Sequence, residues 1–224
     1  MATQPGFTFF GLDGIKMHPR SMALEKASPG RMGRPRKFRE DEALDAAMRV
    51  FWEKGYEGTS LDDLTSAMKI NRSSLYSTFG DKEALFRRVM KQYSAGPLSF
   101  TSEALNLKTA RAVVEALLRF CVKFHGDPGH PPGCLSIQGG LACGSGNEEV
   151  KQAMVDWRKA GLAQLQKRLQ RARAEGDLRK GVNPKDLARL IIIVMNGLGI
   201  QAVNGATPAE MNRAVDLALQ SLPL

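Results

Sequence analysis

The chain has 224 residues, 43% apolar and 25% charged, which fits one large or two small globular domains with a real core. Its formal net charge is +9 and its isoelectric point about 9.7, so polyanions are favoured partners, although charge says nothing about fold. The longest apolar stretch, LIIIVMNGLGI, is too short to span a bilayer, and no secretory signal opens the chain. We therefore expect a cytoplasmic protein with no membrane partner.

Residues 1–37 are rich in glycine, proline, serine and basic residues and show no sustained periodicity. This composition favours a flexible basic N-terminal arm. From Lys16 to Arg39, eight lysines or arginines stand against one acid, Glu25. Such a run indicates nucleic acid as its target. The alternative is a solvated tail that serves solubility alone.

A helical pattern begins after the arm. One apolar stripe predicts a helix over residues 39–54, formed by Leu44, Ala47, Met48 and Phe51. Gly55 is expected to end that helix, as a C-terminal glycine does. Ser60 and Asp63 have capping-box spacing, which predicts a second helix over residues 60–68.

Two further caps follow closely in the sequence. Asn71 is expected to cap a third helix over residues 72–79, and Asp81 a fourth over residues 82–93. Gly96-Pro97 then marks a boundary. We therefore expect a helix-turn-helix DNA-binding domain over residues 38–94 and a second domain over residues 95–224.

The second half also reads as helical. Helices are expected over residues 109–125, 148–175, 184–204 and 208–222, with a short apolar segment at 134–143. The basic run Lys167, Arg168, Arg171 and Arg173 is interpreted as a solvated helix face. No convincing strand or repeat is found, so the predicted fold class is all-α.

The third predicted helix is short and rich in hydroxyl side chains. Leu75 and Phe79 share one side of the helical wheel and can dock on the preceding helices. The other side presents short polar groups, one ring and one guanidinium: Ser73, Ser74, Tyr76, Ser77 and Arg72. That face fits the DNA major groove, where bulky side chains would hold a helix away. A plain surface helix is the alternative.

Residues 33 to about 93 resemble the N-terminal DNA-binding domain of the TetR family of bacterial transcriptional regulators. The resemblance rests on GYEGTSLDDL, on SLYSTFGDKEALF, and on Gly55 and Gly58. It implies an N-terminal helix-turn-helix domain joined to a larger helical domain for effector binding and dimerisation. Members often begin near MGRPRKF, so Met32 is an alternative start of the chain.

Residue roles can be carried over from this resemblance. It assigns phosphate contacts to Thr59, Ser60, Tyr76 and Lys82. It assigns base reading or groove contacts to Arg72, Ser73, Ser74 and Ser77. Arg34 and Arg36 of the arm are expected to reach a neighbouring minor groove. The family often has His-Tyr where this chain has Ser77-Thr78, so we expect a different sequence preference.

The resemblance also implies a ligand pocket in the C-terminal half. The expected wall residues are apolar or aromatic: Leu117, Phe120, Phe124, Leu135, Met154, Trp157 and Met195. Taken singly, such residues are more often core than binding wall. Trp157 is the leading candidate, because its indole N–H could orient a ligand.

The last two predicted helices carry wide apolar stripes. The resemblance implies a homodimer through these two helices, and two such helices from each of two chains would make a four-helix bundle. Any core helix needs a similar stripe, so packing within a monomer is the alternative.

Cys134 and Cys143 flank the short apolar segment, with His125 and His130 nearby in the sequence. Three interpretations stay open: thiols buried as small hydrophobes, an oxidant- or electrophile-sensing thiol, and a Cys/His metal site. No CxxC or HxxxH spacing occurs, so no metal or other cofactor is expected. A structural disulfide is not expected in the cytoplasm.

Three classes of function compete. The first is a homodimeric repressor that reads double-stranded operator DNA, with recognition helices about 34–36 Å apart, and is released by an unidentified small-molecule effector. The second is an enzyme with a DNA-binding module. No Ser-His-Asp order, P-loop, GxGxxG after a strand or HExxH motif supports it. The third is a constitutive DNA-binding protein without an effector. We predict the first, with no enzyme activity.

Overall fold

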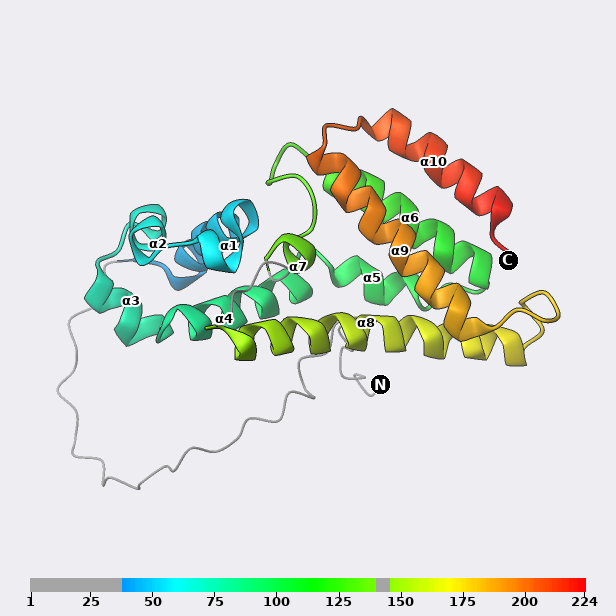
Figure 1. Cartoon of the computed structure of the whole chain (residues 1–224), viewed down its shortest axis with the longest axis horizontal. Coiled ribbons are helices and arrows are strands. Elements are labelled where there is room, and N and C mark those ends of the chain that lie inside the picture. Colours follow the sequence, from blue (N-terminus) through cyan, green and yellow to red (C-terminus); the bar gives the residue numbers. More distant parts are fainter. Residues whose placement is uncertain (1–37, 140–145) are drawn as a thin grey trace, which may run out of the picture.

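The computed structural model describes residues 38–139 and 146–224, and that part of the chain is helical, without a strand (Figure 1). Its helices are α1 (Glu40–Gly58), α2 (Leu61–Met68), α3 (Arg72–Phe79), α4 (Lys82–Ala95), α5 (Ser99–Ala104), α6 (Ala110–His125), α7 (Leu135–Gln138), α8 (Glu148–Ala174), α9 (Pro184–Val203) and α10 (Pro208–Ser221). The predicted all-α class is confirmed.

Helices α1 to α4 gather into a head at one end of the molecule (Figure 1). Helix α8 starts beside α4 and runs to the far end, where it packs against α9. Helices α9 and α10 both pack against α6. The short helix α7 contacts α1, so it lies where the head meets the rest of the molecule.

The head folds as its caps predict. The Ser60 hydroxyl accepts from the Asp63 N–H while the Asp63 carboxylate accepts from the Ser60 N–H, a complete capping box at the start of α2. The side chains of Asn71 and Asp81 accept from the backbone N–H groups of Ser74 and Ala84, the third residues of α3 and α4. Lys69 takes the left-handed conformation (φ 54°, ψ 40°) that turns α2 into α3.

The expectation that Gly55 ends the first helix is only half right. The chain breaks there, at φ 69° and ψ 173°, but helical turns resume and α1 continues to Gly58. Backbone of this kind is essentially restricted to glycine. The break frees the Tyr56 N–H, which donates to the Gly139 carbonyl, just after α7, at 3.1 Å. The kink therefore joins the head to the segment after α7.

Helix α5 was not predicted, and it depends on a residue far away in the sequence. Arg168 of α8 donates to three backbone carbonyls at and after the end of α5, those of Leu105, Leu107 and Lys108, at 2.9–3.3 Å. Arg168 is only 5% exposed. The interpretation of the basic run as a solvated face is therefore wrong for this arginine, which caps buried carbonyls.

Two core clusters organise the molecule. The first joins the inward faces of α1–α4, and the second lies among α6, α9, α10 and the later part of α8. Leu135 of α7 and Val150, Met154 and Trp157 of α8 belong to the first cluster. The core of the head thus extends beyond residue 94.

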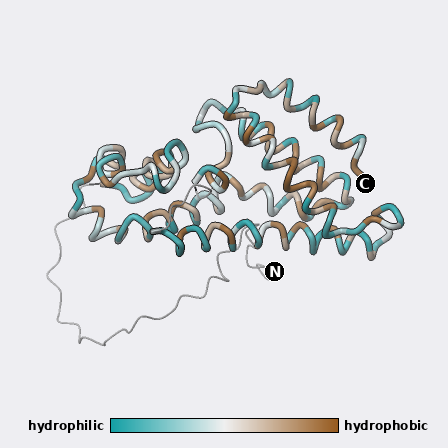
Figure 2. The backbone as a smooth tube through the Cα atoms, viewed as in Figure 1, coloured by the Kyte–Doolittle hydropathy of each residue, from teal (hydrophilic) through white to brown (hydrophobic). Residues whose placement is uncertain are grey.

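Helix α9 matches the helix expected over residues 184–204, and it extends beyond the apolar run LIIIVMNGLGI that it contains. Its twenty residues are long and apolar enough to cross a membrane by length and composition, and Figure 2 shows a largely apolar helix. One side of it, including Leu187, Ile191 and Leu198, lies in the second core cluster. Only 28% of the apolar window is buried in the structure, and Leu190, Ile193 and Ile200 on the same helix are exposed. Core contacts therefore account for only part of its apolar content.

Candidate DNA-binding surface and ligand pocket

Helix α3 has two chemically distinct sides. Leu75 and Phe79 are buried in the head. Phe79 also packs against Phe38 and lies under the Arg88 guanidinium, 4.7 Å from its ring centroid. The opposite side is exposed, with half of Tyr76 accessible to solvent. Two turns of helix, marginal alone, are thus held by their apolar side while the polar side stays accessible.

The exposed side is formed by the hydroxyls and the guanidinium that the sequence indicated. Arg72, Ser73 and Ser77 are exposed and Ser74 is half-buried. The Ser77 hydroxyl donates back to the Ser74 carbonyl at 3.2 Å, so it keeps its acceptor capacity toward the outside.

Arg72 is paired within the head. Its Nη2 donates to Asp62 Oδ1 of α2 at 2.7 Å, and this hydrogen bond and charge raise the pKa of Arg72. Both side chains are well exposed. Surface ion pairs of this kind contribute little net stability, so the guanidinium can exchange Asp62 for a nucleic-acid acceptor at small cost.

The hydroxyl of Thr59, a residue for which the resemblance implies a phosphate contact, is turned into the protein. Thr59 is 2% exposed, and its Oγ1 donates to the Gly55 carbonyl at 2.6 Å. It closes the kink in α1 instead. Ser60 is exposed, but its hydroxyl is engaged with Asp63 in the capping box.

Asp63 places a negative charge at the start of α2. The Lys54 ammonium donates to it at 2.6 Å and, together with the Ser60 hydrogen bonds, holds the pKa of Asp63 well below its usual range. That carboxylate disfavours a phosphate beside Ser60. Lys82 lies at the start of α4, its Nζ 4.4 Å from the centroid of the Tyr56 ring, and it remains suited to a phosphate contact. Arg34 and Arg36 lie outside the described residues.

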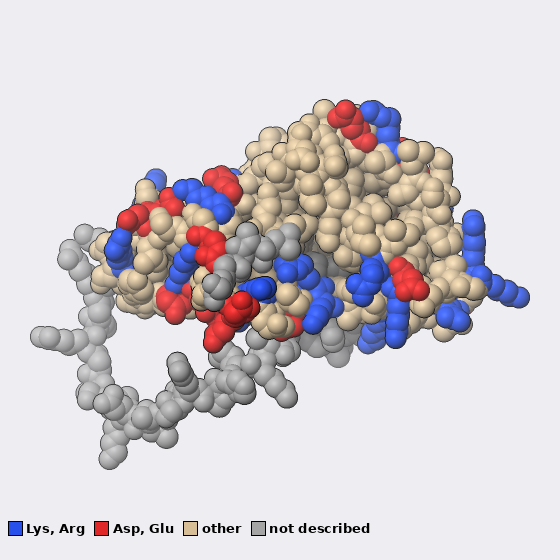
Figure 3. All heavy atoms as spheres, viewed as in Figure 1, with Lys and Arg blue, Asp and Glu red and all other residues tan. Residues whose placement is uncertain are grey.

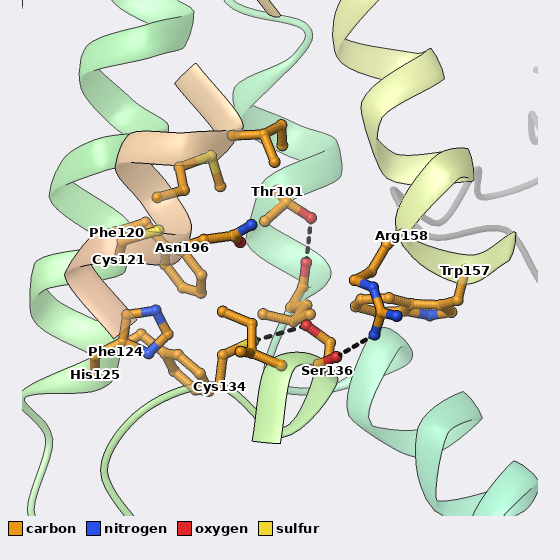
Figure 4. A pocket seen from close by; sticks show the side chains of 14 residues that line it. Thr101, Phe120, Cys121, Phe124, His125, Cys134, Ser136, Trp157, Arg158 and Asn196 are labelled. Atoms are coloured by element: carbon orange, nitrogen blue, oxygen red, sulfur yellow. Dashed lines mark hydrogen bonds between the residues drawn. The ribbon is translucent and has the colours of Figure 1, made fainter. Parts of the chain in front are cut away.

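A cavity of about 70 Å³ lies among α5, α6, α7, α8 and α9 (Figure 4). Its walls are Leu98, Thr101, Phe120, Cys121, Phe124, His125, Cys134, Ser136, Ile137, Trp157, Arg158, Ile192, Met195 and Asn196. Four of the predicted wall residues line it: Phe120, Phe124, Trp157 and Met195. The other three, Leu117, Leu135 and Met154, are instead buried in the core clusters.

The polar wall residues were missed because they come from separate segments that only the fold brings together. The His125 Nδ1 lies 3.0 Å from the Gly133 carbonyl, and the Thr101 hydroxyl donates to the Leu98 carbonyl at 2.6 Å. Arg158 Nη1 donates to the Ser136 carbonyl at 2.9 Å. In Figure 4, His125 and Arg158 stand at opposite sides of the cavity.

The indole N–H of Trp157 has a partner within the protein. Its Nε1–H donates to the Ser94 hydroxyl at 3.1 Å, within the protein. Trp157 therefore offers the cavity a ring surface, and its N–H is engaged elsewhere.

The cysteines differ in their surroundings. Cys134 Sγ lies 2.9 Å from Ser136 Oγ and 3.4 Å from the Tyr93 hydroxyl, in the cavity wall. Burial raises the pKa of the Cys121 thiol, which keeps it protonated and unreactive. Both thiols are free, and Cys143 lies outside the described residues. No group of three or more metal-ligating side chains occurs in the described part of the chain.

The head has a helix-turn-helix whose second helix, α3, is anchored on its apolar side and exposes polar groups on the other. Together with a helical body that contains a cavity, this defines a DNA-binding protein of the helix-turn-helix class. Comparison with known proteins sharpens this class. Residues 43–89 match the family described as bacterial regulatory proteins, tetR family, and residues 110–218 match the tetracyclin repressor-like C-terminal domain. The chain belongs to the TetR family and is a DNA-binding transcriptional regulator.

Individual relatives agree with this assignment. The chain is 36% identical to a cysteine mutant of the TetR family regulator CifR, solved with 26 bp double-stranded operator DNA, with a TM-score of 0.81, covering 85% of this chain and all of that one. It is 28% identical over 196 residues to the HTH-type transcriptional repressor ComR of Escherichia coli, covering 85% of this chain and 92% of ComR. The reduced form of E. coli NemR, at 18% identity and a TM-score of 0.70, shares the fold.

Proposed function

We propose that the protein is a homodimeric repressor that binds double-stranded operator DNA through α3 and leaves it when a small effector enters the cavity. The two-sided character of α3 carries this proposal: Leu75 and Phe79 anchor the helix, while its hydroxyl-bearing side stays exposed. Two relatives support it, since ComR is a named repressor and CifR was solved on operator DNA.

On the DNA, α3 would lie in the major groove. Ser73, Ser77 and Tyr76 would meet base edges or sugar-phosphate there, and Arg72 would exchange Asp62 for a base or phosphate. Lys82, held against the Tyr56 ring, would contact a phosphate as a point charge. The basic arm would add contacts in the neighbouring minor groove.

The homodimer is supported by the outer side of α9 and α10. Five large apolar side chains there are at least 44% exposed: Leu190, Ile193, Ile200, Val203 and Leu217. Figure 3 shows few charged side chains over this face. Exposed apolar patches of this kind mark interfaces, and a second copy of the chain would bury them in a four-helix bundle.

Effector control would follow from the size of the cavity. A cavity of about 150 Å³ holds one benzene molecule, whereas this one measures about 70 Å³. An effector of ring size must therefore push the walls apart, so it binds best to a different conformation. Helix α7 is part of the wall and is joined to the α1 kink by the Tyr56–Gly139 hydrogen bond. Widening would thus move the head and change the spacing of the recognition helices.

A gel-shift assay tests the proposal, with the gene's own upstream DNA measured against random DNA of equal length. We expect strong preference for the upstream DNA and a loss of roughly tenfold or more for Tyr76→Ala. Lys180→Ala, at an exposed basic site far along the chain from α3, is the control and should bind normally. Equal binding to both DNAs would favour the constitutive alternative, and unchanged affinity of Tyr76→Ala would refute the assigned role of α3.

One observation favours a thiol-sensing variant of this function. The Cys134 thiol lies in the cavity wall between two hydroxyl groups. An electrophile such as iodoacetamide would form a bond from Sγ to its methylene carbon, with iodide leaving and the thiol proton passing to water. Such an adduct would add bulk inside the cavity and push its walls apart, as a bound effector would. If Cys134→Ser protein is released from DNA by iodoacetamide as readily as the parent, the thiol is not the sensor.

A further inference from the structure

Two buried side chains face the cavity as hydrogen-bond acceptors. The Thr101 hydroxyl hydrogen is engaged by the Leu98 carbonyl, which leaves the Oγ1 lone pairs for the cavity. His125 is 5% exposed, and its Nδ1 meets the Gly133 carbonyl. A carbonyl oxygen can only accept, so Nδ1 carries the hydrogen.

The second ring nitrogen of His125, Nε2, is therefore the one that can accept a hydrogen bond. Burial lowers the pKa of His125 to about 4, so the ring is neutral at physiological pH and Nε2 bears a lone pair. In the described part of the chain, no hydrogen bond reaches Nε2. Gly199 of α9 keeps the space in front of it open, since a Cβ there would stand 3.4 Å from Nε2. A bound molecule that carries an O–H or N–H can supply a donor to this lone pair.

The charged residues of the cavity wall indicate which ligand charge the cavity favours. Among the described residues, no Asp or Glu lines the cavity, and Arg158 provides its positive charge. An ammonium group would find no counter-charge there and would be repelled by the guanidinium. A carboxylate would bring a further acceptor toward His125 Nε2 and Thr101 Oγ1. The remaining walls are mostly apolar, including Phe120 and Phe124, whose rings stack 5.4 Å apart.

We propose that the effector is a neutral, hydroxyl-bearing apolar molecule, an alcohol or phenol, whose O–H donates to His125 Nε2 while its carbon body packs on Phe120 and Phe124. This inference rests on the proposed function of the cavity as the effector site. It goes further because it names the functional group that is recognised and the atom that recognises it.

An isomer pair tests it with the full-length protein. The compounds p-cresol and anisole have the same formula and similar size, but only p-cresol has a hydroxyl hydrogen to donate. Each requires the same widening of the cavity, so that cost cancels in the ratio of their affinities. Dissociation constants would be measured from the NMR shift of the Trp157 indole N–H in the cavity wall. Benzoate and benzylammonium are the anionic and cationic ligands measured for comparison.

We expect p-cresol to bind about tenfold more tightly than anisole, because only p-cresol can donate a hydrogen bond to Nε2. His125→Asn keeps a donor for the Gly133 carbonyl but lacks Nε2, and should reduce that ratio to about two or less. Phe120→Leu is the control: it should weaken both isomers alike and leave the ratio unchanged. Melting temperatures of the variants establish that each is folded.

Several results would overturn the inference: equal affinities in the parent protein, an unchanged ratio in His125→Asn, tighter binding of benzoate or benzylammonium, or no binding of either isomer. These are distinguishable from failure of the proposed function. If anisole binds as well as p-cresol and releases operator DNA, the cavity is an effector site and only the hydroxyl preference is wrong. If compounds bind the cavity but never affect operator binding, the proposed function is wrong.

Discussion

Replacing Gly55 by alanine should destabilise the protein strongly. Gly55 holds φ 69° and ψ 173°, a region that costs a side-chain-bearing residue about 1–3 kcal/mol. A Cβ at this position would also stand 3.0 Å from the backbone oxygen of Gln138, which cannot rotate away. Strain and contact together suggest a loss of about 3 kcal/mol.

Thermal unfolding followed by circular dichroism measures this effect. A loss of about 3 kcal/mol lowers the melting temperature of a protein of this size by roughly 6–12 °C. Gly58→Ala is the matched control, since its added Cβ would meet only Lys54 Cβ at an ordinary 3.7 Å, and Gly58 is not among the glycines of positive φ. That variant should stay within about 1 kcal/mol of the parent.

Equal melting temperatures for the two variants would refute the reasoning, because the strain would then be absent or relieved by movement of α7. Such movement has its own signature. If Gly55→Ala retains stability but loses operator binding, the kink sets the position of the head rather than its stability.

Three other measurements follow from the structure. Leu75→Ala should destabilise by about 2–5 kcal/mol in urea unfolding, whereas Ser73→Ala should stay within about 0.5 kcal/mol and weaken operator binding; equal losses of stability would contradict the two-sided view of α3. His125 has its pKa lowered to about 4, so the folded state binds fewer protons than the unfolded state between about pH 6.5 and 4, and stability should fall on the order of 3 kcal/mol as pH drops through that window. His125→Asn should flatten that part of the pH profile of urea midpoints, and an unchanged profile would assign the slope to other groups. If the protein forms the proposed homodimer, Ile193→Asp should make it monomeric in light scattering at micromolar concentration, and a persistent dimer would place the interface elsewhere.

The sequence was most informative where structure is local. The caps at Ser60, Asn71 and Asp81 depend on hydrogen bonds within three residues, and helical periodicity alone separated Leu75 and Phe79 from the hydroxyl side of α3. These features need no knowledge of the rest of the fold.

Predictions failed where a partner lay far along the chain. Helix α5 depends on Arg168, more than sixty residues away, and the Trp157 indole is engaged by Ser94. Thr59 is a different case, because its partner, the Gly55 carbonyl, is only four residues away, and the kink at Gly55 turns the hydroxyl inward. The roles of Thr101 and His125 as hydrogen-bond acceptors could not be predicted either. Each role depends on a backbone carbonyl, of Leu98 or Gly133, that takes the side chain's hydrogen and leaves a lone pair for the cavity.

The overlap of α8 with the core of the head affects how the molecule can be divided. At 27 residues α8 is about 40 Å long, and Val150, Met154 and Trp157 at its start complete the apolar packing of α1–α4. A fragment cut after residue 94 would leave an open hydrophobic seam and lose its neighbours Leu98 and Leu135 as well. Exchanging heads between such regulators should therefore carry the opening turns of α8 along, and heating should melt head and body together as a single cooperative unit.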